Sequence, residues 1–509
     1  MGEDNIFKMF PGLPKMVVDF IKKLVATIGE KDSKIARQEE EIRELRERLG
    51  LNSRNSSKPP HTDGYGKQAG HAEKGEADAD ATRQEPAVSK NRSLREKSGR
   101  KAGGQKGHKG AGMKFSGPPD ETLEHVPDPC VGCPDRSGCD GSRELVATQN
   151  EKVLEIRLRR VCHKTYAYCC PLRDGERLEG GKPFGGTNRY GSSVVSFITL
   201  LYALGVVSYD RIGKIFKGLT GESISTGTLH TFIMGCRDKV AGAVGRIKEL
   251  LAGSVLAHFD ETGLFVNGVL NWLHTASNSV FTYLSVQKKR GEEGMRAAGV
   301  LGLFKGIAVT DCWSPYFKFK GIGHALCNAH LIRELRNRLT NAKQEWAGKM
   351  DKLLNLINDE KHALIDRGIL AFPDERLVEF VKQYDGIVSV GIRGNPIPER
   401  KPNQRGRLKL GKTRALLERL VKYKDYYLLF AYDFTVPFTN NEAERSCRAA
   451  RVRENVSCFR TDNGASTWAD IMSYIKTAVK NGVTEYDAIK AMLSGDALNL
   501  IENITVDKR

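Results

Sequence analysis

Two acidic residues end short apolar runs in the middle of the chain. The run SVLAHFDETG reaches Asp260 and Glu261, and the run GIAVTDCW reaches Asp311. Such bounded apolar runs are typical of buried strands, so each acid is expected at a strand end, where ligands gather at the edge of a sheet. Taken singly, each aspartate could equally be a surface residue that caps a turn. Side by side, the two would be ligands for a hard cation such as Mg²⁺.

A third acid is expected in the segment VPFTNNEAERSCRAARVRE, which predicts a helix over 441–453. Glu442 and Glu444 both lie there, and spacing alone does not separate them. Three carboxylates can hold two divalent ions about 3.5–4 Å apart on either side of a scissile phosphate. One ion activates the attacking water or 3′-hydroxyl, and the other stabilises the leaving oxygen. The predicted chemistry is therefore cleavage or joining of phosphodiester bonds.

Basic residues accompany these acids. The predicted helix also carries Arg445, Arg448, Arg451 and Arg453, which could contact DNA phosphates. The net charge is +18, from 80 Lys and Arg against 62 Asp and Glu. Nucleic acid is the commonest acidic partner of such a chain, although a basic composition alone is equally compatible with an ordinary soluble protein.

Six of the 11 cysteines fall within residues 130–170, around a β-like run. Clustering favours a metal site over a disulfide scaffold, and four thiolates can form a tetrahedral structural Zn²⁺ site. The alternative is a module without metal. The expected ligands are Cys130, Cys133, Cys139 and Cys169, with Cys170, Cys162 and His163 as substitutes.

Two segments without a core of their own precede this module. Residues 14–50 predict a coiled-coil helix, because Ile21, Ile28 and Ile35 begin a series of apolar residues at every seventh position. Polar residues at other seam positions indicate modest self-association, and a solvated helix is the alternative. Residues 51–120 are rich in Gly, Ser, Lys and Pro, which predicts a flexible linker or spacer. Lys101 and Lys106 in it could follow a phosphate backbone.

The elements that must position the acids follow from 188 onward. Residues 188–250 predict a helical domain with a helix-turn-helix outline, whose second helix starts at Ser225 or Thr226. Many helical hairpins share this outline. Residues 254–312 have strand patterns with a tight turn at Asn267–Gly268. Residues 328–435 are mostly helical, and 441–480 predict two helices separated by a turn at 462–464.

These features together resemble the DDE transposases of the insertion-sequence-66 family. The resemblance implies a multidomain α/β protein with an RNase H-like mixed sheet and a helical insertion, and a triad of Asp260, Asp311 and Glu444 that holds two Mg²⁺ or Mn²⁺ ions. His330 matches a recurring family position and could approach the metal site or a phosphate, with a packed or hydrogen-bonded histidine at a helix start as the alternative. Glu261, His330 and Glu442 are the residues that could support the triad. Beyond the zipper-like helix and the cysteine cluster, the matching segments are NSSKPP (55–60), RKAGGQKGHKG (100–110), HFDETG (258–263), NWLHTAS (271–277), DCWSPYF (311–317), HALCNAHLIREL (324–335), VPFTNNEAER (436–445), SCFRTDNGA (457–465) and MSYIKTAVKNG (472–482).

The function implied is a transposase that binds the ends of its element, cleaves there and transfers the 3′-hydroxyl ends to target DNA. Its expected partners are terminal-repeat and target DNA, a second copy of the chain, and accessory transposition proteins. A catalytically inactive DNA-binding regulator and a nuclease without strand transfer remain as alternatives. Cys312 and Cys327 are expected to pack beside the sheet rather than to do chemistry.

The expected location is the cytoplasm of a prokaryote, associated with the nucleoid. The start, MGEDNIFKMF, has acidic residues where a secretory signal would be basic, and no run approaches the roughly 18 apolar residues of a membrane span. The expected domains are a coiled-coil helix (14–50), a basic linker (51–120), a zinc-binding DNA-contact module (121–180), a helical domain (188–250), the first part of the core (251–330), a helical insertion (331–435), the second part of the core (436–485) and a C-terminal tail (486–509).

Overall fold

The computed structural model describes residues 190–398, 410–456 and 458–506, together with residue 408, parts of 159–179 and scattered residues between 16 and 38. Its contacts divide the chain into two units, Met1–Ala77 with Tyr190–Arg509, and Asp78–Arg189. The basic linker and most of the predicted coiled coil and cysteine module lie outside the described residues. Within the coiled-coil segment, Leu24, Ile28 and Ile35 are helical and exposed.

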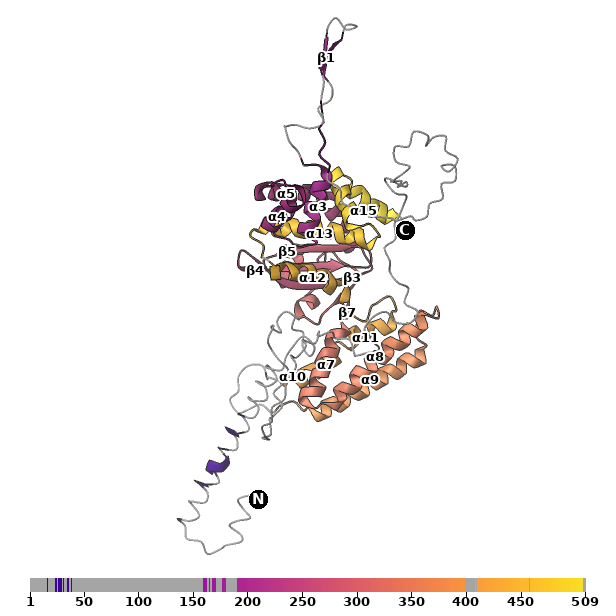
Figure 1. The fold of residues 1–509 in the computed structure, drawn as a ribbon. Coiled ribbons are helices and arrows are strands. Elements are labelled where there is room, and N and C mark those ends of the chain that lie inside the picture. The colour runs from indigo at the N-terminus through magenta and orange to yellow at the C-terminus, as the bar shows by residue number, and fades with distance from the viewer. Residues whose placement is uncertain are drawn as a thin grey trace, which may run out of the picture. The chain divides into compact units, whose positions relative to one another are not determined.

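A five-stranded mixed sheet forms the centre of the larger unit, in the order β5-β4-β3-β6-β7 (Figure 1). β3, β4 and β5 are antiparallel neighbours, and β6 and β7 run parallel to β3. The predicted turn at Asn267–Gly268 is confirmed, since both residues have the positive φ, 48° and 76°, that a type I′ turn requires. The strands are β3 (Leu256–Val266), β4 (Val269–Ser277), β5 (Thr282–Gln287), β6 (Ile307–Thr310) and β7 (Gly323–Leu326).

One hydrophobic core contains residues of the sheet, of the helices that precede it in sequence and of the helices from α12 onward. α12 contacts β3 and β4, whereas α13 contacts β5 and α5. α13 also closes the outer edge of the sheet, because the hydroxyls of Thr477 and Ser473 accept the backbone N–H groups of Thr282 and Leu284. The helices of this core are α3 (Ser192–Ala203), α4 (Tyr209–Thr220), α5 (Thr226–Ala252), α12 (Asn441–Val456), α13 (Asp462–Lys480), α14 (Glu485–Ser494) and α15 (Ala497–Val506).

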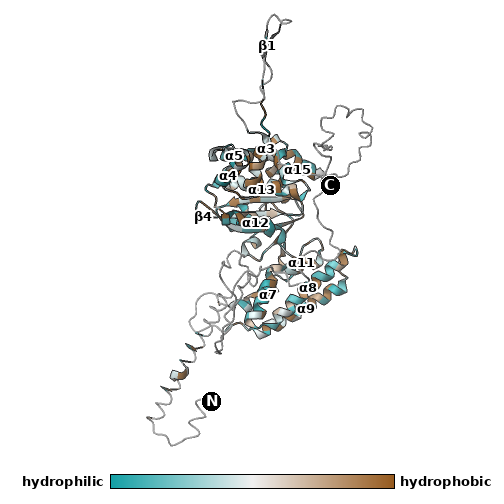
Figure 2. Ribbon diagram, viewed as in Figure 1, coloured by the Kyte–Doolittle hydropathy of each residue, from teal (hydrophilic) through white to brown (hydrophobic). Residues whose placement is uncertain are grey.

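A second core lies among the helices between β7 and α12, against β6 and β7. Leu354, Tyr384 and Leu417 are fully buried at its centre. Figure 2 shows hydrophilic and hydrophobic residues alternating along α8 and α9, as expected of helices with one buried face. These helices are α7 (Asn328–Ala342), α8 (Glu345–Ile365), α9 (Asp374–Gly394), α10 (Gly411–Lys422) and α11 (Lys424–Tyr432).

Smaller elements complete the described structure. α6 (Glu292–Ala298) and the 3₁₀ helix η5 (Ser314–Lys318) flank β6 in sequence. In the smaller unit, β1 (Ala167–Cys170) and β2 (Glu176–Glu179) form an antiparallel pair.

Several expectations are confirmed and others are corrected. The predicted helical hairpin is confirmed as α4 and α5, with Gly221 ending the first helix and Ser225 capping the second. These helices share the sheet's core instead of forming a helical domain apart from it. The expected tail at 486–509 contains α14 and α15, because Ile489, Met492 and Ile501 are buried in that same core. The turn expected at 462–464 is the first turn of α13.

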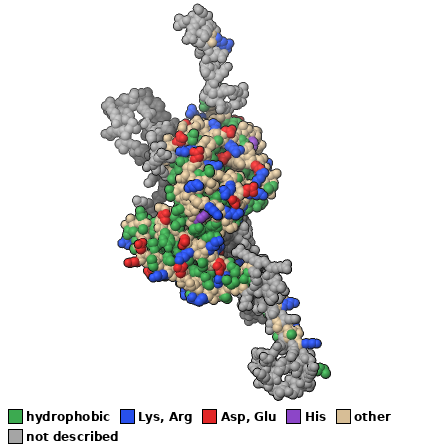
Figure 3. All heavy atoms as spheres, turned by 180° about the vertical axis from the view of Figure 1, so that it is seen from behind, with side chains coloured by type: hydrophobic (Ala, Val, Ile, Leu, Met, Phe, Trp, Pro, Cys, Tyr) green, Lys and Arg blue, Asp and Glu red, His purple; other side chains and the backbone are tan. Residues whose placement is uncertain are grey.

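The surface combines both charges. Figure 3 shows acidic and basic side chains interspersed over the face it presents. Among the helices that the structure describes, none has a stretch long and apolar enough to cross a bilayer.

Candidate active site

The pairing of β3 with β6 places the two predicted aspartates at one level of the sheet. Leu256 pairs with Ile307 and His258 with Val309, an offset of 51 positions. The same offset separates Asp260 from Asp311, so Asp311 lies just after the end of β6, beside Asp260. The expected strand end is confirmed for Asp311 and is wrong for Asp260 and Glu261, because β3 continues through the hairpin arm to Val266. The backbone N–H of Trp313 donates to Asp311 Oδ1 at 3.1 Å. Burial, with Glu444 as a smaller cause, raises the pKa of the Asp311 carboxyl.

Glu444 reaches the same place from α12. Burial and then the charges of Asp311 and Glu444 raise the pKa of Asp260 to about 7. His330 Nδ1, at the start of α7, lies 3.6 Å from Glu444 Oε1, and Arg333 Nη2 lies 3.9 Å from Glu444 Oε2. The structure therefore brings Asp260, Asp311 and Glu444 together, with His330 beside them.

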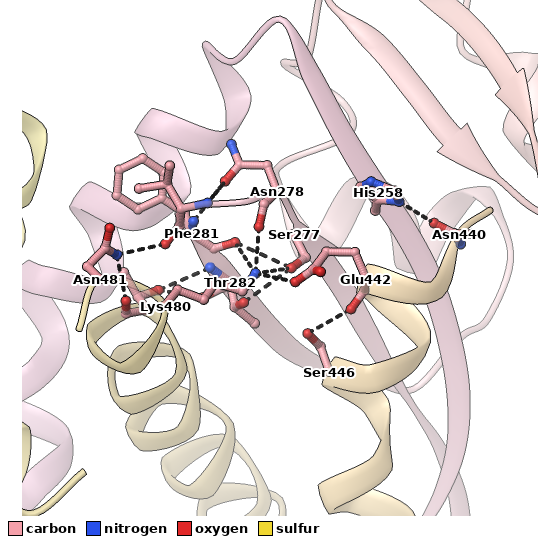
Figure 4. Close-up of polar contacts among 12 residues, drawn as sticks. His258, Ser277, Asn278, Phe281, Thr282, Asn440, Glu442, Ser446, Lys480 and Asn481 are labelled. Carbon is pink, nitrogen blue, oxygen red and sulfur yellow. Dashed lines mark hydrogen bonds and ion pairs between the residues drawn. The ribbon is translucent and has the colours of Figure 1, made fainter. Parts of the chain in front are cut away.

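The two glutamates of α12 point in different directions. Residues two apart on a helix are separated by about 200° around its axis. Glu442 forms an ion pair with Lys480 of α13 at 2.7 Å, and Lys480 also donates to Ser277 and to backbone oxygens of the β4–β5 turn (Figure 4). Glu442 thus anchors α12, and Glu444 alone of the two joins the aspartates.

Glu261 is buried, and as the next residue along β3 its side chain points to the face opposite that of Asp260. The hydroxyl of Tyr316 donates to Glu261 Oε1, and Arg290 Nε lies 3.6 Å from Glu261 Oε2. The Arg290 guanidinium stacks between Trp272 and Trp313, at 5.0 and 3.9 Å from the ring centroids. Burial raises the pKa of Glu261 to about 8, against the hydrogen bond from Tyr316.

Sequence reasoning missed Tyr316 and Arg290. Tyr316 lies within the DCWSPYF segment that carried the resemblance, so its position in a matching motif was an available signal. Arg290 follows β5 in the stretch QKKRGEEG, which has no such signal. Only the packing on Trp272 and Trp313 identifies it.

The donor set fits a hard divalent cation. Among the described residues, Glu444 Oε1 and His330 Nδ1 are buried without a hydrogen-bond partner, which is costly unless a ligand completes them. The three carboxylates are suitable ligands for Mg²⁺ or Mn²⁺, and the imidazole of His330 lies beside Glu444.

Cys327 is the remaining potential ligand here, since its Sγ, a His330 nitrogen and a Glu444 oxygen lie within 4.8 Å of one another. Its Sγ accepts the backbone N–H of Asn440 at 3.1 Å, and burial raises the pKa of the thiol to about 11. A neutral, engaged thiol is a weak ligand. Cys327 therefore packs beside the sheet, as the sequence predicted, and Cys312 is half-buried next to Asp311.

The arginines of α12 divide between surface and interior. Arg445 and Arg448 are exposed. Arg451 Nε donates to Thr262 Oγ1 at 3.2 Å, and its charge lowers the pKa of Asp260 against the larger effect of burial. Arg453 corrects the expectation of a DNA contact, because it is buried with its guanidinium 4.3 Å from the ring of Tyr202.

The predicted zinc ligands and linker lysines fall in the part of the chain that the structure describes least. Cys169 lies on β1 opposite Arg177, but its side chain is not among those described. The rest of this group lies outside the described residues, namely Cys130, Cys133, Cys139, His163, Lys101 and Lys106.

Comparison with known proteins identifies a family for the part of the chain that contains the three acids. The family model described as "Transposase IS66 family" matches residues 188–467, more than half of the chain. A second model, of a family of unknown function (DUF6444), matches residues 18–89. A search of curated proteins finds no match.

Proposed function

The chain belongs to the transposase IS66 family, and we propose that it cleaves DNA at the ends of its element and joins the freed 3′-hydroxyls to target DNA. The observation that carries the proposal is the meeting of Asp260, Asp311 and Glu444, from β3, the end of β6 and α12. Burial and then the charges of Asp311 and Glu444 raise the pKa of Asp260, which is consistent with a site that a cation would complete. On this proposal the mixed sheet with α12 is an RNase H-like core, and α7–α11 form the insertion between the second aspartate and the glutamate.

The three carboxylates would hold two Mg²⁺ or Mn²⁺ ions, with His330 as an additional or supporting ligand. Such ions, when bound, supply Lewis acidity at the scissile phosphate and lower the pKa of the attacking water or hydroxyl. Arg451 and Arg333 lie beside the carboxylates and are suited to a phosphate oxygen. Glu261 supports the part of β3 that carries Asp260 through its contacts with Tyr316 and Arg290.

The remaining assignments belong to the same proposal. Arg445 and Arg448 are exposed on α12 and would contact DNA backbone, as would Lys101 and Lys106. The cysteine module would bind structural Zn²⁺ through Cys130, Cys133, Cys139 and Cys169. The N-terminal helix would pair two copies of the chain, accessory transposition proteins would assist, and the reaction would take place on DNA in a prokaryotic cytoplasm.

A strand-transfer assay with intact and pre-cleaved element ends tests the proposal. Joined product with Mg²⁺ or Mn²⁺ is the expected result. Nicks without joining would support a nuclease instead. A mobility shift without any cleavage would support an inactive DNA-binding regulator.

A matched set of variants tests the triad. Asp260→Asn and Glu444→Gln should each abolish cleavage and joining and leave DNA binding intact, because each removes a ligand charge without changing shape. Glu442→Gln is the control on the same helix. It should retain cleavage and lose about 1–3 kcal/mol of stability, because the half-buried Lys480 loses its paired carboxylate. Two outcomes would contradict the assignment. One is DNA cleavage by Asp260→Asn, and the other is loss of cleavage in a folded Glu442→Gln variant while Glu444→Gln still cleaves.

A further inference from the structure

Asn440 is the residue just before α12, and it is 1% exposed. Asparagine at this position commonly caps its own helix. Here both side-chain hydrogen bonds go to β3 instead. Nδ2 donates to the Phe259 carbonyl at 2.8 Å, and Oδ1 faces His258 Nδ1 at 2.9 Å (Figure 4). These contacts hold α12 to the two residues immediately before Asp260.

The amide orientation and the histidine tautomer follow from these contacts. The Phe259 carbonyl can only accept, so the NH₂ group of Asn440 must face it. Oδ1 then faces His258, whose Nδ1 must carry a proton to donate. The bridge is therefore a complementary pair of hydrogen bonds.

The backbone of Asn440 connects the other two parts of the site. Its N–H donates to Cys327 Sγ at 3.1 Å, three residues before His330, and its carbonyl accepts the N–H of Glu444 at 3.3 Å. Cys327 in turn donates its backbone N–H to the carbonyl of Thr310, the residue before Asp311, at 2.9 Å. Each of the four residues proposed to hold or support the metal thus lies within four positions of a residue in this hydrogen-bond network. They are Asp260, Asp311, His330 and Glu444.

We infer that Asn440 is a positioning residue that sets the mutual distances of the three carboxylates through bonds to β3, to Cys327 and to the first turn of α12. This inference rests on the proposed metal-dependent function. The three carboxylates repel one another in the metal-free state, so a fixed frame is needed to keep them at ligand spacing. Asn440 supplies that frame without adding charge.

The test uses Asn440→Ser, which leaves room and polarity but cannot span both partners. Asn481→Ala is the matched control, because Asn481 also bonds two backbone carbonyls, those of Val280 and Thr477, away from the carboxylates. Mn²⁺ binding to the full chain is followed by the metal-dependent rise in Tm and by cleavage rate. We expect Asn440→Ser to raise the half-saturating Mn²⁺ concentration about tenfold, with the rate loss larger at low than at saturating Mn²⁺.

Asn481→Ala should lower the Tm in EDTA and leave half-saturation unchanged. If Asn440→Ser does not fold, His258→Ala breaks the same bridge from β3, and the same tenfold shift is expected. Unchanged half-saturation in a folded variant, or an equal shift in Asn481→Ala, overturns the positioning role. Absence of any Mn²⁺ response in the unaltered chain overturns the proposed metal site itself, so the two failures are distinguishable.

Discussion

Asp260 and Glu261 are consecutive carboxylates whose environments differ because neighbouring side chains of a strand point to opposite faces. Asp260 faces α12 and the other two members of the proposed triad, and Glu261 faces Tyr316 and Arg290. Both carboxyls have raised pKa values, about 7 and about 8, mainly through burial. The middle of one strand thereby carries both an acid of the proposed triad and the buried glutamate beside it.

These shifts predict how the metal-free fold depends on pH. A carboxyl whose pKa is raised on folding stabilises the fold below its ordinary value near 4, and this contribution is lost as the pH rises through its folded value. In EDTA, stability should therefore fall by about 1–3 kcal/mol between pH 5 and pH 8. Asp260→Asn should reduce that fall and be the more stable protein at pH 8.

Urea unfolding at the two pH values, with and without Mn²⁺, measures this effect. Added Mn²⁺ should restore stability to the unaltered chain at pH 8 and should help Asp260→Asn little. If the unaltered chain and Asp260→Asn lose stability equally in EDTA, the buried carboxylates are not the cause.

At the scale of the element, α12 combines three roles on different sides. Glu444 faces the aspartates, Glu442 anchors the helix to Lys480, and Arg448 is exposed. Arg453 lies in the interior, where its Nη1 donates to the Tyr202 carbonyl at 3.3 Å while its Nε has no partner. A sequence rich in arginine therefore gives a helix of which only part can meet DNA.

This division predicts opposite effects for two arginine substitutions. Arg448→Ala should weaken DNA binding and reduce its salt dependence, with little change in stability, because it removes one exposed phosphate contact. Arg453→Met should leave DNA binding unchanged and alter stability by less than about 2 kcal/mol, since a buried charge is exchanged for an apolar chain of similar length. DNA-binding titrations at several salt concentrations, together with thermal unfolding, distinguish the effects of the two substitutions. Weakened binding by folded Arg453→Met would contradict the buried placement.

At the scale of the whole larger unit, two hydrophobic cores meet at the sheet. The helices before the sheet and those after α12 close the first core, and α7–α11 enclose the second. The site lies where elements of both converge, because Asp260 and Glu444 belong to elements of the first and His330 belongs to α7 of the second. The packing of α7 in the second core therefore places His330 beside Glu444 of the proposed triad.

The C-terminal helices α14 and α15 contribute buried side chains to the first core and should stabilise the fold. Ile501 on α15 is fully buried, whereas Leu498 on the same helix is 39% exposed. Ile501→Ala should cost about 2–5 kcal/mol through lost burial and a residual cavity. Leu498→Ala should cost less than about 1 kcal/mol. Chemical unfolding of both variants is the measurement, and equal losses would mean that α15 is not packed as described.

The sequence by itself determined features that depend on neighbours along the chain. Asn267–Gly268 specifies its turn because few residues accept positive φ. The apolar runs before Asp260 and Asp311 specify strands, and their separation of 51 equals the register offset of β3 and β6. The family resemblance was also identified from short contiguous sequence motifs.

Only the tertiary structure decided which side of each element meets the site. It paired Glu442 with Lys480, buried Arg453, and identified Arg290, Tyr316 and Asn440, whose partners lie far away in sequence. It also replaced an expected tail by two packed helices. The physical reason is that helix and strand periodicity is encoded locally, whereas the rotation of a helix against a sheet depends on long-range packing and hydrogen bonds that no local pattern records.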